Sequence, residues 1–508
     1  MKEPSSEFKE RYTDAKTFRS GVEDKIRQVY RFCAPGRETE FNQSSSRTSR
    51  STQEEADTYH TLGESYAVDL AGDLMTYFTP VEARWFETEI LNDFGGQQEL
   101  EDMALEIVSK REDDLADMIA TSNFYDVAPQ IYFEGATHGT QAMWVQQASV
   151  TQPVFCEPVP PAELLLVPGH LGILDRFREK YVPAKSLESL FLNYAVTFSP
   201  AIRQKIDSKS RVMVKLCWGF WLNWSDPGRP RWMMEATVDG ECITYEPIDL
   251  GDMQGACPLI VGRFNPQPGR PWARGPGLSA LNDLRAYDKI AELDLLGLED
   301  AISNTIIYPN DGVLDFSDGL VPGRAYPAGQ NFDRNKIFEM TKGKNLQAAW
   351  FSEERLEMRI MKAFFQDGPR QRGDTPPTAF QWSDEQRRLQ QRLGKPSAPL
   401  WSEFVLPFLQ RIEYLGVQTG RLEQFMSIGD QNLKVQPVSP LQKAQNRDQI
   451  GVSRDNLMFG AQLFAERLPE VVDMKATLDK HMAASGDRLT VLNKGTPQGA
   501  QALPPAPV

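Results

Sequence analysis

Cysteine and histidine are scarce in this chain of 508 residues, and their spacing argues against the usual disulfide and metal sites. The five cysteines are widely separated, odd in number and form no Cys-x-x-Cys pair, so we expect neither a disulfide framework nor a zinc site. Buried free thiols in a reducing compartment are the simpler interpretation. The four histidines stand alone, without the His-Glu-x-x-His spacing of a metal centre, and each is predicted to be a core or surface residue. No metal or other cofactor is expected.

Sequence motifs of catalysis are missing as well. The chain has no phosphate-binding loop and no Gly-x-Ser-x-Gly elbow. With 70 Asp and Glu residues, spacing alone cannot single out a catalytic carboxylate pair. The sequence therefore predicts a protein that is not an enzyme, with a poorly marked carboxylate enzyme as the alternative.

Long apolar runs are also absent, which bears on location. No stretch of about 18 apolar residues occurs, so we expect no membrane-spanning segment. The first residues, MKEPSSEFKERY, lack the apolar core of a signal peptide. We expect the protein to be made and folded in the cytosol.

Positive charge is in deficit, with a formal net charge of −15. A protein that coats nucleic acid would be expected to carry a basic surface, so this class is disfavoured. A conduit through which DNA slides without being gripped is compatible with an acidic chain. The length suggests two to four domains, and 41% hydrophobic with 25% charged residues is typical of a soluble globular protein.

The chain is organised around residues 278–365. Apolar residues recur every three to five positions from Leu278 to Ile302, and no proline occurs between Leu278 and Ile307. This pattern predicts a helix of about 30 residues and roughly 45 Å. Residues 308–345, rich in Pro, Gly and Asp, then interrupt the pattern before a second helix leads back to Phe365. Such a unit suits either a coiled-coil arm or a spoke in a ring of identical subunits.

Charges differ between these two predicted helices. The first is mainly acidic, whereas the second places Arg355, Arg359 and Lys362 on one face. Glu354 and Glu357 lie at helical spacing from these cations and could pair with them. The faces are either solvated or line an opening through which a polyanion passes.

A β-hairpin is predicted over residues 211–238. Apolar and aromatic residues alternate from Arg211 to Trp224, Asp226-Pro227-Gly228 provides a turn, and alternation resumes from Trp232 to Val238. One aromatic face results. We interpret it as a core face, although aromatic clusters can also stack on nucleic acid bases.

Helical patterns fill much of the remaining chain. They are predicted over Phe8–Phe32, Asp57–Phe78, Leu100–Ser122, Thr378–Gly420 with kinks at its prolines, and in parts of Val435–His481. Residues 366–377 contain too much Gly and Pro for regular structure and form a predicted loop with Arg370 and Arg372.

Short motifs follow one another in a fixed order along residues 10–485. They are Thr79-Pro80 before Trp85-Phe86, Ser122-Asn123-Phe124, the strand Pro258–Arg263, Gly275-Pro276-Gly277 before the long helix, Thr378-Ala379, and Ser439-Pro440-Leu441. In this order they resemble the portal proteins, or head-to-tail connectors, of short-tailed phages (podoviruses).

The resemblance implies an α+β, mainly helical portal-type fold, assembled as a ring that usually has twelve subunits. Its parts would be a wing (1–276), a first stem helix (277–307), a clip (308–346), a second stem helix (347–365), a tunnel loop (366–377), a long kinked wing helix (378–434), a helical crown (435–487) and a disordered tail (488–508).

The resemblance also implies a function. The ring would sit at one vertex of the capsid in the virion, after assembly in the host cytoplasm, and conduct double-stranded DNA during packaging, retention and ejection. Its partners would be further copies of itself, the major capsid protein, the terminase motor, which hydrolyses ATP, and a tail adaptor protein, without a membrane. The alternative is another virion interaction protein, such as a tail adaptor or an internal ejection protein.

Candidate site residues follow from the same resemblance. Arg370 and Arg372 on the tunnel loop would face DNA. The stem residues Arg355, Arg359 and Lys362 would either contact phosphates or, as we rank first, form ion pairs between subunits. Clip residues expected to bind partners are Asp315, Phe316, Asp318, Arg324 and Tyr326.

Overall fold

A computed structural model describes most of the first 423 residues in two compact units. The described ranges are 3–42, 58–81, 84–90, 98–149, 152–191, 194–208, 212–252, 254–302, 346–367, 392–394 and 396–423, with short pieces at 306–307, 338–339, 427–428, 431–432, 435–437, 453–454, 456–458 and 477–478. One unit combines Met1–Val81 with Asp113–Gln424, and the other combines Glu82–Glu112 with Phe425–Val508. Helices and sheets both contribute to the first unit, so the predicted α+β class is confirmed.

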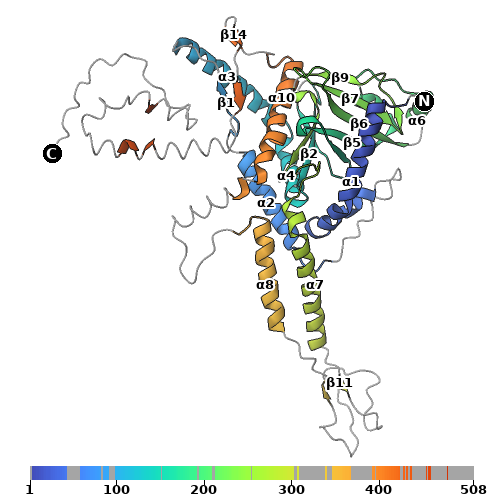
Figure 1. The fold of residues 1–508 in the computed structure, drawn as a ribbon, viewed down its shortest axis with the longest axis vertical. Coiled ribbons are helices and arrows are strands. Elements are labelled where there is room, and N and C mark those ends of the chain that lie inside the picture. The colour runs from blue at the N-terminus through green and yellow to red at the C-terminus, as the bar shows by residue number, and fades with distance from the viewer. Residues whose placement is uncertain are drawn as a thin grey trace, which may run out of the picture. The chain divides into compact units, whose positions relative to one another are not determined.

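An antiparallel sheet forms the β-rich part of the first unit (Figure 1). Its strands run in the order β4-β5-β6-β7-β8, and β9 also pairs with β7. They span β4 Leu164–Pro168, β5 Leu174–Pro183, β6 Met213–Asn223, β7 Arg231–Val238, β8 Glu241–Cys242 and β9 Ile248–Gly251. The β6–β7 pair is the predicted hairpin, with Leu222 opposite Trp232.

The hairpin is buried on both faces, whereas the sequence predicted one aromatic face. Trp218 and Phe220 pack into the large core cluster on one side. Trp221, only 1% exposed, packs on the other side with Phe8 from helix α1 (Ser6–Cys33). A Cβ on Gly219 would lie 2.7 Å from the Phe8 ring, so the missing side chain lets α1 approach the sheet.

A smaller sheet, ordered β10-β2-β3, contributes to the same large core cluster (β2 Thr140–Gln146, β3 Phe155–Pro158, β10 Leu259–Arg263). Helices α2 (Leu62–Phe78) and α4 (Phe124–Thr137) pack against each other beside it. Helix α2 begins five residues later than predicted, and Tyr59 and His60 just before it instead bond to residues 284 and 288. Helix α3 (Gln98–Ala120) matches its prediction closely.

The described part of the chain from residue 392 is largely helical up to Gln418, as the sequence predicted for Thr378–Gly420 with kinks at its prolines, although the resemblance extended this helix to residue 434. A π-helical turn spans Trp401–Val405, where Leu406 N–H donates to Trp401 O, and α10 follows over Leu406–Gln418. Pro407 has no N–H to bond one turn back, which favours this irregularity at a predicted kink. The helix stops before Gly420, whose φ of +69° is left-handed. Two short strands, β13 Ser427–Ile428 and β14 Gln431–Asn432, occupy the end of the predicted helical range.

The first residues of the predicted helical crown form a strand. In the second unit, β15 (Val435–Pro437) pairs antiparallel with β1 (Thr88–Ile90). Pro437 stands at the end of this strand, where the missing N–H is tolerated. The prediction of helix was therefore wrong at these three residues.

Candidate functional site

Helices α7 (Pro276–Ile302) and α8 (Leu346–Ala363) lie side by side (Figure 1). They are antiparallel, since Asp283 near the start of α7 meets Arg359 near the end of α8. We call this pair the stem. The first helix was predicted to reach Ile307, but it ends at Ile302, and β11 (Ile306–Ile307) pairs with β12 (Phe338–Glu339).

Glycines fix the base of the stem. Gly275 N–H donates to His138 O at 3.0 Å, which places the start of α7 against the corner between α4 and β2. A Cβ on Gly139 would lie 2.3 Å from Gly275 N, and Gly139 has a φ of +96°. The Gly-Pro-Gly motif of the sequence thus marks a close backbone approach that larger residues would prevent.

Residues 58–60 brace α7 from one side. Tyr59 N–H donates to Asp288 Oδ1 at 2.8 Å, and His60 Nε2 lies 3.2 Å from Leu284 O. The His60 ring stacks on Phe32 of α1. Burial lowers the pKa of His60, so its ring is neutral and Nε2 donates to the carbonyl. The sequence predicted only a core or surface histidine here, because its contacts come from distant segments.

Contacts with α2 and the following segment hold α8. Ile360 and Phe364 are fully buried, and Gln366 Nε2 donates to Asp73 Oδ2 of α2 at 2.8 Å. Arg392 donates to both carboxylate oxygens of Asp367, at 2.8 and 3.0 Å. This ion pair joins the two described residues that flank positions 368–391.

The predicted cations of α8 lie on an exposed face, but one has a partner that differs from the prediction. Arg359 Nη2 lies 2.8 Å from Asp283 Oδ1 on α7 of the same chain, and its side chain is 65% exposed. The sequence favoured Glu354 and Glu357 as partners because the spacing of residues along one helix can be read from the sequence. Which residues of two helices face each other cannot. Arg355 and Lys362 are also exposed.

The other predicted site residues lie outside the described part of the chain. They are Arg370 and Arg372 of the tunnel loop and Asp315, Phe316, Asp318, Arg324 and Tyr326 of the clip.

Exposed leucines surround the outer half of α7. Leu293, Leu295, Leu296 and Leu298 are between 45% and 54% exposed in the single chain. Such a cluster on one helix is unusual for a surface that only faces water. The sequence pattern assigned Leu293 and Leu298 to one apolar side and gave no sign of exposure.

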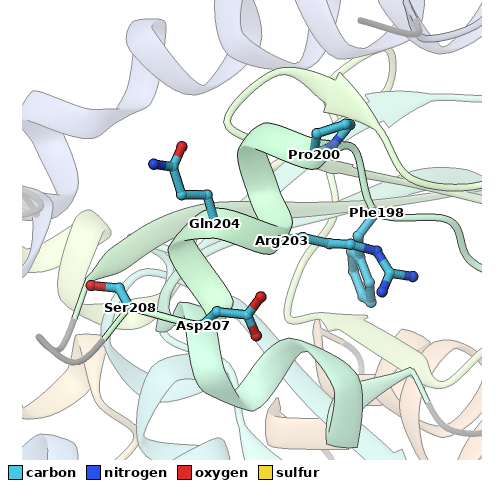
Figure 2. A pocket seen from close by; sticks show the side chains of 6 residues that line it. All are labelled: Phe198, Pro200, Arg203, Gln204, Asp207 and Ser208. Carbon is cyan, nitrogen blue, oxygen red and sulfur yellow. The ribbon is translucent and has the colours of Figure 1, made fainter.

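One hollow on the described surface lies at helix α6. The hollow beside α6 (Pro200–Ile206), of about 750 Å³, is lined by Phe198, Arg203 and Asp207 together with Pro200, Gln204 and Ser208 (Figure 2). Figure 2 shows Arg203 beside Phe198 while Gln204 points away from it.

Among the described residues, no group of three or more His, Cys, Asp and Glu side chains could hold a metal ion. Within the same residues, no helix is long and apolar enough to cross a bilayer.

Comparison with known families decides the assignment. The family model "Bacteriophage head to tail connecting protein" matches residues 5–494. The chain belongs to this family. The resemblance found in the sequence is therefore confirmed for the head-to-tail connectors, a family of structural proteins.

Two of the solved structures similar to this connector come from gene transfer agent (GTA) particles. One is the "Neck of empty GTA particle computed with C6 symmetry", 12% identical, with 77% of this chain and 86% of that chain covered and a TM-score of 0.38. Another is the "Virion of native gene transfer agent (GTA) particle", 13% identical, with 76% and 89% covered and a TM-score of 0.32. No curated protein sequence matches the connector.

Proposed function

We propose that this connector is a phage portal protein: a closed ring of identical subunits, twelve in number, that conducts double-stranded DNA through one capsid vertex. The observation that carries the proposal is the stem with its exposed leucines. Membership of the head-to-tail connecting family supports the same conclusion. We also propose that the phage is short-tailed.

The exposed leucines lie on two flanks of α7, which is the arrangement that contacts within a ring would need. Tyr287 and Asp294 mark the side of α7 that faces α8, because both lie near Glu353. At about 100° per residue, Leu295 is rotated roughly 90° to one side of that line and Leu293 roughly 110° to the other. In a ring each subunit has two different neighbours, so each spoke needs two different contact flanks.

Burial of these side chains would favour assembly. Because these leucines are about half exposed, covering each one contributes roughly half of the 1.5–3 kcal/mol that a fully exposed leucine would gain, or about 0.8–1.5 kcal/mol. A ring repeats this gain at every subunit boundary. A membrane or a single docked partner would cover one flank only, whereas Leu293 and Leu295 lie on opposite flanks.

DNA would pass through the lumen without tight binding. The net charge of −15 disfavours a continuous basic surface, and a few local cations can contact phosphates transiently. We propose that Arg370 and Arg372 serve this purpose on the tunnel loop. Arg355 and Lys362 would line the bore or meet acids of the next subunit, and Arg359, paired with Asp283, would stiffen the stem.

Docking partners would meet the two ends of the ring. We propose that the clip, with Asp315, Phe316, Asp318, Arg324 and Tyr326, contacts the terminase motor and later the tail adaptor. The wing would contact the major capsid protein.

Electron microscopy of the purified full-length chain tests the proposal. The expected result is annular particles with a central bore wide enough for a DNA duplex. A population of compact monomers at all protein concentrations would contradict it and favour a tail adaptor or internal ejection protein.

A further inference from the structure

A small cavity in the wing contains more positive than negative charge. The cavity, of about 70 Å³, lies between the two sheets and α10. We call it the Arg411 cavity; the lining residues used below are Glu157, Arg178, Lys180, Tyr194 and Arg411.

Arg411 is a buried cation with no carboxylate partner among the described residues. It is 5% exposed. Its Nε donates to Val145 O at 3.1 Å, and its Nη1 donates to Gly255 O and Ala256 O at 3.0 and 2.9 Å. The guanidinium also lies over the Tyr414 ring, 5.0 Å from its centroid, but these contacts supply no negative charge, and burial lowers the pKa of Arg411.

Arg178 shows what a compensated guanidinium looks like in the same cavity. It is 2% exposed and bonds to two carboxylates, Glu157 at 2.8 and 3.0 Å and Glu163 at 2.9 and 3.1 Å. Lys180 shares Glu157 with it. Arg178 and Lys180 are thus balanced by two carboxylates, and the third cation, Arg411, is the one positive charge left over.

Hydrogen-bond donors remain for a ligand at this point. The bonds of Arg411 use Nε and Nη1, so Nη2 has no partner among the described residues. Tyr194 lines the same cavity, and a tyrosine hydroxyl can donate a hydrogen bond. A guanidinium with neighbouring donors in a desolvated site favours an oxyanion over chloride, because two N–H groups can bond two oxygens at once.

We propose that the Arg411 cavity binds a small free oxyanion of the inorganic phosphate class, which neutralises Arg411 and locks α10 onto β2. A cavity of this size excludes a DNA strand. The site is thus separate from the channel and does not depend on ring formation.

Equilibrium dialysis of the full chain against radiolabelled inorganic phosphate, with chloride holding the ionic strength constant, tests the proposal. The expected result is saturable binding near one phosphate per chain at millimolar concentration, with competition by sulfate. Arg411→Lys should weaken binding by at least about tenfold, because one ammonium cannot bond three carbonyls and an oxyanion together.

Two further variants make the result decisive. Lys180→Gln changes a half-buried residue at the cavity and should weaken phosphate binding by about threefold or more even if Arg411→Lys does not fold. Arg203→Gln, at the hollow beside α6, is the matched control and should bind phosphate as the unaltered chain does. Absence of saturable binding, displacement by chloride as effective as by sulfate, or unchanged binding in Lys180→Gln would overturn the proposal.

Discussion

Glu134 lies in a buried polar cluster that joins α1, α4 and the short helix η1 (Arg37–Asn42). Its carboxylate accepts hydrogen bonds from Tyr30 Oη, from Arg37 Nη2 at 2.6 Å and from His138 Nε2 at 3.0 Å. Burial by itself would raise the pKa of Glu134. The bond from His138 and the charge of Arg37 outweigh burial and lower the pKa to about 2.

Replacement of Glu134 by Gln should lower the free energy of unfolding at neutral pH by on the order of 3 kcal/mol. Because the folded pKa lies below the ordinary value of 4.5, the stabilisation is fully present above pH 4.5 and is lost as the pH falls through about 2. Urea unfolding at neutral and acidic pH measures the difference between variant and parent, which should shrink on acidification.

Glu40→Gln is the matched control for this measurement. Glu40 also pairs with Arg37, at 2.8 Å, but is partly exposed, so its loss should change stability by less than about 1 kcal/mol. Equal effects of the two substitutions, or a difference that persists unchanged in acid, would contradict the role given to Glu134.

At the scale of elements, the attachment of the stem depends on backbone contacts at its base. Gly139→Ala would place a methyl group 2.3 Å from Gly275 N in a left-handed conformation. We expect a loss of about 3 kcal/mol in stability, measured by urea unfolding. Gly21→Ala in α1, where no atom lies within 4 Å of the added methyl group, should instead gain about 1 kcal/mol. A neutral Gly139→Ala would show that the close approach is unimportant.

The two leucine flanks of α7 can be tested separately. Leu293→Asp and Leu295→Asp should each prevent rings at concentrations where the parent chain forms them, because an unpaired carboxylate would be buried at every boundary. An equimolar mixture should give dimers and no rings, since only one flank of each variant remains intact. Analytical ultracentrifugation distinguishes these species.

Leu171→Asp serves as the control for the flank variants. Leu171 is 75% exposed on the β4–β5 connection, away from the stem. Rings should form as in the parent chain. Normal rings from both stem variants would exclude these leucines from the subunit contact.

At the scale of the whole molecule, the role proposed for the tunnel-loop arginines can be tested only in the assembled particle. Arg370→Ala with Arg372→Ala should reduce the yield of DNA-filled particles or their DNA retention, while annular particles still form. The reason is the loss of two transient phosphate contacts from each subunit. Nuclease protection of packaged DNA measures the effect.

A double variant elsewhere controls for charge. Arg203→Ala with Arg229→Ala removes the same charge from the wing and should leave packaging unaffected. Normal packaging and retention by the loop variant would refute its role.

The elements that sequence predicted well are those whose pattern is local. Periodicity identified the stem helices, and alternation with an Asp-Pro-Gly turn identified the β6–β7 hairpin. Sequence did not reveal that α1 covers Trp221, that Arg359 pairs across to Asp283, or that Arg178 and Arg411 are buried. Each of these contacts and burials depends on residues that folding brings together from distant segments of the chain. A charged residue considered by itself is expected at the surface. The strand at Val435–Pro437 was missed for the same reason, since its partner lies more than three hundred residues earlier.

The separation of Leu293 and Leu295 around the α7 axis carries a geometric consequence. The angle between the two contact faces of a protomer determines how many copies form a closed ring. Inserting one residue into α7 ahead of Leu293 would swing both leucines by about 100° relative to the wing. Such a chain would keep all its apolar area yet close with a different copy number, or wind into an open spiral.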